Sequence, residues 1–119
     1  MLKRGNIYVI YCNYIKPPHD KICLCFCEID RLFFFINSAP RLTPDAQEII
    51  HQAEQANVLT HDSYIDLSGP KTFSADEVLK AQDRGPLAPA AIQRIRARLL
   101  QGPSTLSARY KALALANLT

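Results

Sequence analysis

Two short apolar runs, close together in the chain, constrain the fold of this sequence most. They cover residues 22–27 and 32–36, and a mostly polar segment, 28–31, separates them. Runs of this length that are rich in aromatic and β-branched residues and are bounded by turn-forming residues are typical of buried strands rather than helices. The sequence therefore predicts a β-hairpin whose open end brings segments 16–21 and 37–38 together above an apolar floor.

Length and composition favour a single domain. A chain of 119 residues is long enough to bury roughly 65% of its unfolded surface. The 48% hydrophobic and 21% charged content is ordinary for a globular protein. No run approaches the roughly 20 apolar residues of a membrane span, and the apolar segment 7–10 is too short for a signal peptide. We therefore expect a cytoplasmic protein without a membrane segment.

The net charge of +3 is too small to indicate a nucleic-acid-binding protein by itself. Its distribution is uneven, with basic residues at the N-terminus, at the open end of the hairpin and in the C-terminal third. We interpret the C-terminal group as the solvated face of a helix. The basic residues in question are Lys3, Arg4, Lys16, Lys21, Arg84, Arg94, Arg96, Arg98, Arg109 and Lys111.

The four cysteines do not have the spacing of a metal site. Cys23, Cys25 and Cys27 alternate along the predicted strand, whereas zinc knuckles use two cysteines separated by a tight turn. Alternate residues of a strand share a face at about 7 Å per step, which does not suit a tetrahedral centre. We interpret these three thiols and Cys12 as small, reduced, buried packing residues.

The other predicted strands lie on both sides of the hairpin. Residues 6–12 are rich in β-branched and aromatic side chains, and Pro17 and Pro18 end this strand because proline cannot donate to a sheet. Residues 58–59 and 63–67 predict one more strand, which the Ser-Gly-Pro of 68–70 ends.

Four helices are predicted. Thr43 as N-cap opens a helix over 44–56 that Asn57 closes, and the capping box of residues 74–77 opens a short helix to about Gln82. A longer helix starts at Pro89 and ends at Gly102 and Pro103, with arginines on its wet side. Ser104 caps a last helix, from Leu106 to about Leu118. This order predicts an α+β fold: a small curled antiparallel sheet or β-barrel with helices segregated toward the C-terminus.

Three segments resemble a known family. Residues 3–10 resemble the basic-Gly-polar-Ile-aromatic-aliphatic entry strand of the MazF/PemK-like toxins of type II toxin–antitoxin pairs. Residues 61–68 are similar to that family's Asp-Ser-hydrophobic-hydrophobic-Asp strand, and 84–87 to its Gly-x-Leu approach to the final helix. Together they span most of residues 3 to 100.

The resemblance implies one SH3-like barrel domain over residues 1–119. The predicted C-terminal helix, at about 104–118, is an addition to the family's pattern. It also implies a homodimer that cleaves single-stranded RNA without a metal or other cofactor and that a cognate antitoxin inhibits. Lys21 stands where family members commonly have an arginine, and Ser38 matches their threonine or serine after the next strand. Lysine keeps the charge but lacks the guanidinium fork that grips a phosphate with two bonds.

The chemistry of RNA cleavage points to the same segment. Attack by the 2′-hydroxyl needs a base, an acid for the leaving oxygen, and a cation beside the phosphorus. His19 supplies an imidazole as base or acid, Lys21 supplies the charge and Ser38 supplies a hydrogen bond. The residues expected to bind RNA are Lys16, Tyr14 and Asn37, with Tyr14 as the stacking candidate.

The remaining histidines have simpler interpretations. His51 fits the surface of the predicted helix, and His61 fits an exposed turn before a strand. The chain has no glycine-rich phosphate loop, no Gly-x-Ser-x-Gly elbow and no His-Glu-x-x-His motif, which disfavours nucleotide-dependent and zinc hydrolase chemistry. Two hypotheses stay open: an endoribonuclease toxin, or a catalytically inactive SH3-like module that binds a protein or nucleic-acid partner.

Overall fold

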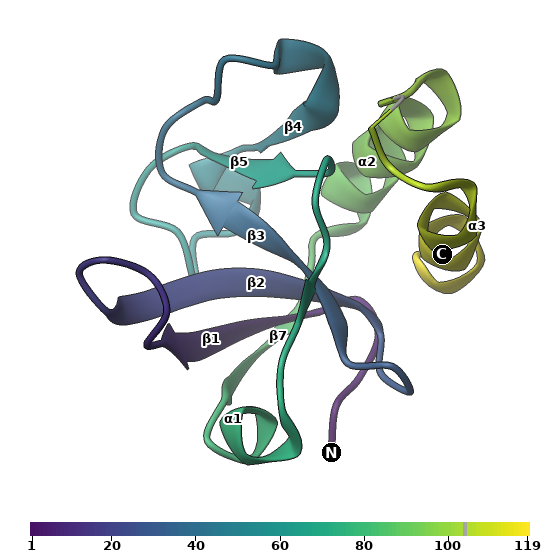
Figure 1. Cartoon of the computed structure of the whole chain (residues 1–119). Coiled ribbons are helices and arrows are strands. Elements are labelled where there is room, and N and C mark those ends of the chain that lie inside the picture. The colour runs from purple at the N-terminus through teal and green to yellow at the C-terminus, as the bar shows by residue number, and fades with distance from the viewer. Residues whose placement is uncertain (104) are drawn as a thin grey trace.

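The computed structural model describes residues 1–103 and 105–119, and its centre is one antiparallel sheet of seven strands (Figure 1). The strand order is β4-β5-β3-β2-β1-β7, and the short β6 pairs with β3. The strands are β1 (Asn6–Cys12), β2 (His19–Cys27), β3 (Leu32–Asn37), β4 (Gln47–Ile50), β5 (Ser63–Asp66), β6 (Lys71–Thr72) and β7 (Gln82–Pro86). The helices are η1 (Pro44–Ala46), η2 (Gln52–Glu54), α1 (Ala75–Leu79), α2 (Pro89–Gln101) and α3 (Ala108–Asn117).

The predicted hairpin is confirmed and lies in the middle of the sheet. β2 pairs with β3 so that Ile22 faces Ile36, and β1 pairs with the other edge of β2. β2 begins at His19, three residues before the predicted apolar run, so His19 belongs to a strand and not to the preceding loop. The strand predicted over residues 6–12 is also confirmed.

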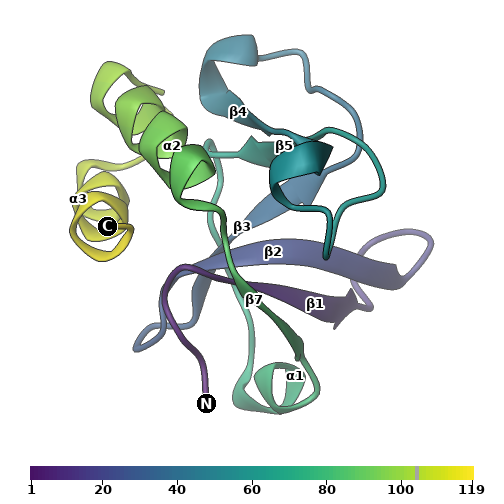
Figure 2. The ribbon, with the colours of Figure 1, turned by 180° about the vertical axis from the view of Figure 1, so that it is seen from behind.

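Both faces of the sheet are covered, which explains why the hairpin strands are apolar on both sides. One face packs against α2 and α3, which lie together on one side of the sheet, and α1 lies on the opposite side (Figures 1 and 2). The stacked rings of Phe26 and Phe34, with centres 4.1 Å apart, belong to the first face. Phe33 and Phe35 pack against Phe73 on the second.

The cysteines are buried and free, as interpreted, but they do not share one face. A bulge shifts the register between Cys25 and Cys27, so Cys23 and Cys25 pack on the α1 side while Cys27 joins the core beneath α2 and α3. Burial raises the pKa of Cys23, and raises that of Cys25 to about 12. The prediction of one row of three thiols is therefore wrong, because the extra residue of a bulge reverses the alternation.

The helix predicted over 44–56 is wrong. Residues 44–46 form only the short η1, and residues 47–50 form strand β4, which pairs with β5. Thr43 makes no capping hydrogen bond through its side chain, and Asn57 does not close a helix. The apolar pair Ile49 and Ile50 fits a helix as well as a strand, and the segment becomes a strand because it pairs with β5.

Two further boundaries differ from prediction. The capping box at Ser74 and Glu77 is confirmed, but α1 ends at Leu79, and the polar segment Gln82–Pro86 forms edge strand β7 against β1. Residues 58–59 are not a strand. β5 covers Ser63–Asp66, one residue shorter than predicted.

The prediction that the arginines of α2 form a solvated face is wrong, because their side chains bind other segments of the chain. Arg94 donates to Glu54 and to the carbonyl oxygen of Ile49, and Arg98 pairs with Glu48, so α2 is fastened to β4 and η2. Arg96 donates to the carbonyl oxygens of Leu115 and Leu118 at the end of α3. Partners distant in the sequence hold these cations, which a helical pattern does not reveal.

The C-terminal helices are present. α2 ends at Gln101, before Gly102 and Pro103, as predicted. α3 begins at Ala108, and Ser107 caps it by accepting a hydrogen bond from the backbone of Tyr110. The predicted cap, Ser104, lies outside the described residues.

The fold is therefore α+β, with an antiparallel sheet and helices mostly toward the C-terminus. Among the described strands, the end strands β4 and β7 do not pair with each other, so the sheet is open. In the part of the chain that the structure describes, every helix is too short or too polar to cross a membrane.

Candidate functional site

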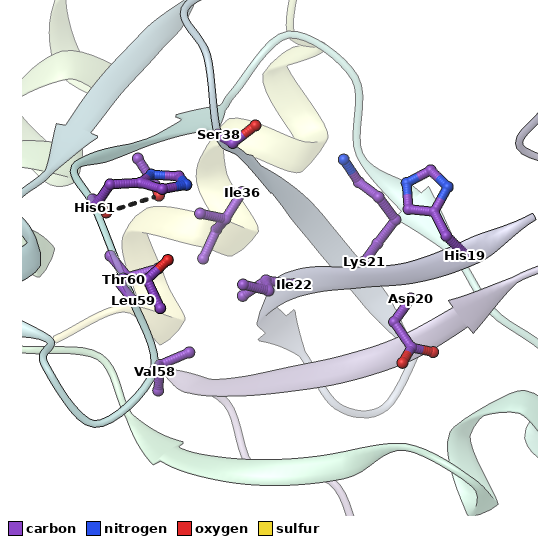
Figure 3. A pocket seen from close by; sticks show the side chains of 11 residues that line it. His19, Asp20, Lys21, Ile22, Ile36, Ser38, Val58, Leu59, Thr60 and His61 are labelled. Carbon is purple, nitrogen blue, oxygen red and sulfur yellow. Dashed lines mark hydrogen bonds between the residues drawn. The ribbon is translucent and has the colours of Figure 1, made fainter. Parts of the chain in front are cut away.

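A pocket of about 230 Å³ lies between the start of β2, the end of β3 and the loop into β5 (Figure 3). It has a polar rim and an apolar floor. The lining residues are His19, Asp20, Lys21, Ile22, Ile36, Ser38, Val58, Leu59, Thr60, His61 and Ser63. All three residues predicted to be catalytic, His19, Lys21 and Ser38, are therefore brought to one pocket.

Strand pairing explains this convergence. Ile22 faces Ile36 across β2 and β3, so the next positions, Lys21 and Asn37, also face each other. On its other side β3 pairs with β5 through Asn37 and Tyr64, so the residues just beyond, Ser38 and Ser63, are neighbours. The segment before β5 therefore closes the pocket opposite β2.

Lys21 is the cation of the site. Its Nζ donates to Oδ1 of Asn37 at 2.9 Å and lies 5.0 Å from the centre of the Phe35 ring. Burial, and then the positive charge of Arg41, lower the pKa of Lys21 from its ordinary value. The ammonium group is thus half-buried and held in place by Asn37 and Phe35.

Two imidazoles lie on different walls of the pocket, His19 on β2 and His61 in the loop before β5 (Figure 3). Nδ1 of His19 lies 2.7 Å from the carbonyl oxygen of Pro17, and Nδ1 of His61 lies 3.0 Å from that of Asp62. A carbonyl oxygen only accepts hydrogen bonds, so in each ring Nδ1 carries the hydrogen. A neutral ring then has its lone pair on Nε2, the nitrogen free to take a proton.

The hydroxyl groups of Ser38, Thr60 and Ser63 add hydrogen-bonding capacity to the polar side of the pocket. Ser63 donates to the carbonyl oxygen of His61 at 3.2 Å, which ties the His61 loop to β5. Asp20 contributes a carboxylate on the opposite face of β2 from Lys21 (Figure 3). The residues that line the pocket therefore include a lysine, two histidines and three hydroxyl-bearing residues, while the Asp20 carboxylate points away from Lys21.

The residues predicted to bind RNA lie outside the pocket lining. Tyr14 and Lys16 lie on the loop between β1 and β2, and both are exposed. Asn37 is buried, and its side chain positions Lys21. Their proposed contacts with RNA remain predictions.

The part of the site that the His61 loop contributes was not predicted from the sequence. His61 fits an exposed turn by its local sequence, and Thr60 carries no local signal. Only the pairing of β5 with β3 brings this loop to Lys21 and Ser38. The available signal in the sequence was a histidine two residues before a predicted strand.

Comparison of the chain with models of protein families, with curated proteins and with solved structures finds no match in any of the three.

Proposed function

We propose that this protein is a metal-independent endoribonuclease of the MazF/PemK type, with its open, curved sheet as an SH3-like barrel. One observation supports the proposal most: His19, Lys21, Ser38 and His61 all line the described pocket, although His19 and His61 are 42 residues apart in the sequence. A base, an acid, a cation and a hydrogen-bond donor are the groups that cleavage by a 2′-hydroxyl requires.

The cleavage step follows from the two imidazoles. Nε2 of one ring takes the proton of the 2′-hydroxyl, and the 2′-oxygen forms a bond to phosphorus. The bond from phosphorus to the 5′-oxygen breaks, and the other ring, protonated, gives that oxygen its proton from Nε2. The products are a 2′,3′-cyclic phosphate and a free 5′-hydroxyl. Lys21 stabilises the added negative charge on the phosphate.

Both rings suit this exchange. The Nδ1 hydrogen bonds of His19 and His61 to carbonyl oxygens persist in the neutral and the protonated ring, so the orientation of each ring is the same in either role. As in the family that the sequence resembles, we propose a cytoplasmic homodimer that a cognate antitoxin inhibits.

The direct test incubates the purified protein with single-stranded RNA in the presence of a chelator and analyses the new ends. We expect cleavage to 2′,3′-cyclic phosphates. His19→Ala and His61→Ala should each slow cleavage by about 10²- to 10⁴-fold. His51→Gln is the control, because His51 lies outside the pocket lining and is half exposed, and glutamine keeps a polar group beside Asp62, on the loop that carries His61. This variant should cleave normally.

The alternative, an SH3-like interaction module, predicts a different result. High-level expression would leave cells and RNA intact, and capture of a partner would survive Lys21→Ala and His19→Ala. Growth arrest that these two substitutions relieve supports the nuclease. Intact RNA under all conditions refutes it.

A further inference from the structure

Three cations gather around two residues at the end of β3, next to the pocket. Lys21 Nζ and Arg41 Nη2 both donate to Oδ1 of Asn37, at 2.9 Å and 3.2 Å. The ammonium groups of Lys21 and Lys71 lie 5.0 Å and 5.5 Å from the centre of the Phe35 ring. We call Lys21, Arg41 and Lys71 the cation cradle.

The cradle is held by buried groups. Asn37 is 5% exposed, and because lysine and arginine only donate hydrogen bonds, its amide must turn its oxygen toward both. Phe35 is 8% exposed, so its ring is packed in the core, and the ammonium groups of both lysines lie over it. Asn37 and Phe35 carry no charge, so they orient the three cations without neutralising them.

Arg41 is fixed through its backbone as well. The buried side chain of Gln47 accepts a hydrogen bond from the backbone N–H of Arg41 at 2.9 Å and donates one to its carbonyl oxygen at 3.1 Å. The connection between β3 and η1 is thereby held with its guanidinium beside Lys21. These two hydrogen bonds hold the backbone of Arg41, and the bond to Asn37 holds its side chain.

The cradle differs from the other cationic groups of the protein. Arg4, Arg94, Arg98 and Arg109 each pair with a carboxylate. In the described part of the chain, no salt bridge involves a cradle residue. Asp66 favours the charged form of Lys21 from a distance, but its Oδ1 already accepts two hydrogen bonds from Ser68.

We infer that the cation cradle binds the phosphate backbone of a single-stranded nucleic acid as it enters the pocket, with Arg41 supplying the guanidinium fork that Lys21 lacks. The identity of this ligand rests on the proposed function, because Lys21 belongs both to the cradle and to the pocket. Uncancelled cations beside a site for a phosphodiester suit a polyanion, and a planar guanidinium grips a phosphate with two bonds.

The test measures binding separately from cleavage. The probe is a fluorescent single-stranded oligothymidylate, which lacks the 2′-hydroxyl and cannot be cleaved by this chemistry. Its affinity is measured over a series of salt concentrations for the full chain, Arg41→Ala, Arg41→Lys and Lys71→Ala. The control is Arg109→Ala, which also removes one positive charge. Arg109 lies on α3 and pairs with Asp30 in the turn of the β2–β3 hairpin, at the end opposite the cradle.

Each loss of a cradle cation should reduce the slope of log affinity against log salt by about 0.7. Arg41→Lys should retain the slope but bind more weakly than the unchanged protein, because it keeps the charge without the fork. Arg109→Ala should leave the slope unchanged. An unaltered slope in Arg41→Ala, or an equal loss in Arg109→Ala, overturns the inference.

The two proposals fail separately. RNA cleavage that Arg41→Ala leaves intact, with unchanged oligothymidylate binding, overturns the cradle and keeps the nuclease. Cradle-dependent binding without cleavage of RNA supports the cradle and refutes the nuclease. Circular dichroism and urea unfolding of each variant establish that a loss of binding is not a loss of fold.

Discussion

The side chain of Gln47, on β4, brackets the backbone of Arg41 by accepting from its N–H at 2.9 Å and donating to its carbonyl oxygen at 3.1 Å. The buried amide of Gln47 thus fixes the backbone of the exposed connection between β3 and η1, and with it the position of Arg41. Two neutral hydrogen bonds of this kind are worth about 1 kcal/mol each.

Gln47→Met removes both bonds and keeps the approximate shape of the side chain. We expect a loss of about 1–2 kcal/mol in the free energy of unfolding and weaker oligothymidylate binding, although no charge is removed. Gln55→Met is the matched control. Gln55 is also buried, and its amide bonds to the backbone of Ala88 and Pro86, so its loss should cost similar stability without weakening binding. Equal binding by Gln47→Met and the unchanged protein would contradict the positioning role.

Arg94 should be the most important cation for stability. It joins α2 to Glu54 by two hydrogen bonds and to the carbonyl oxygen of Ile49 by a third, at 3.1 Å. Arg94→Met should lower the free energy of unfolding by about 1–3 kcal/mol, and Arg94→Lys should recover only part of it because an ammonium cannot reproduce the fork. Arg109→Met should cost less than about 1 kcal/mol, since its ion pair is exposed. Urea denaturation measures all three, and equal losses at Arg94 and Arg109 would contradict the ranking.

The Arg94–Glu54 pair also predicts a pH dependence. Hydrogen bonding from Arg94 lowers the pKa of Glu54 below its ordinary value. As the pH falls, the unfolded chain therefore binds a proton first, and the stabilisation is present above the unfolded pKa of about 4.3 and lost as the pH falls through the folded pKa.

The stability difference between the unchanged protein and Arg94→Met should accordingly be largest near neutral pH and shrink in acid. It should not vanish, because the bond to Ile49 does not titrate. Urea midpoints measured across this range test the prediction. A difference that stays constant from neutral to acidic pH would show that Glu54 is not the relevant partner.

The four cysteines should be chemically inert in the folded protein. All are buried, and burial raises the pKa of Cys12, Cys23 and Cys25, so little thiolate is present at neutral pH. A thiol reagent should label no cysteine rapidly under native conditions and four after denaturation in urea. Rapid native labelling of any one of them would show that its strand opens.

Removing one ring of the aromatic stack should be costly. Phe26 and Phe34 are both fully buried and nearly parallel, at 15°. Phe34→Ala should lower the free energy of unfolding by about 3–5 kcal/mol, through lost burial and the cavity that remains. Ile29→Ala, at an exposed position of the hairpin turn, should change it by no more than about 0.5 kcal/mol. A loss below about 1 kcal/mol at Phe34 would mean that the core beneath α2 closes around the gap.

Local sequence patterns predicted the elements whose signals do not depend on distant partners. The hairpin of β2 and β3, the strand β1, the capping box of α1 and the proline-initiated α2 were all found from residue type and spacing. β4 was not, because Ile49 and Ile50 fit a helix as well as a strand. β7 was missed because a polar edge strand containing Gly85 and Pro86 has no apolar alternation to detect.

The sequence by itself determined that this chain builds a strand-rich core and carries His19, Lys21 and Ser38 at the open end of a hairpin. Only the tertiary structure decided that β5 pairs beside β3, which brings His61 to the same pocket, and that Gln47 holds Arg41 next to Lys21. The physical reason is that side-chain spacing and turn chemistry act between near neighbours. Strand pairing and buried hydrogen bonds instead join residues whose separation along the chain leaves no local trace.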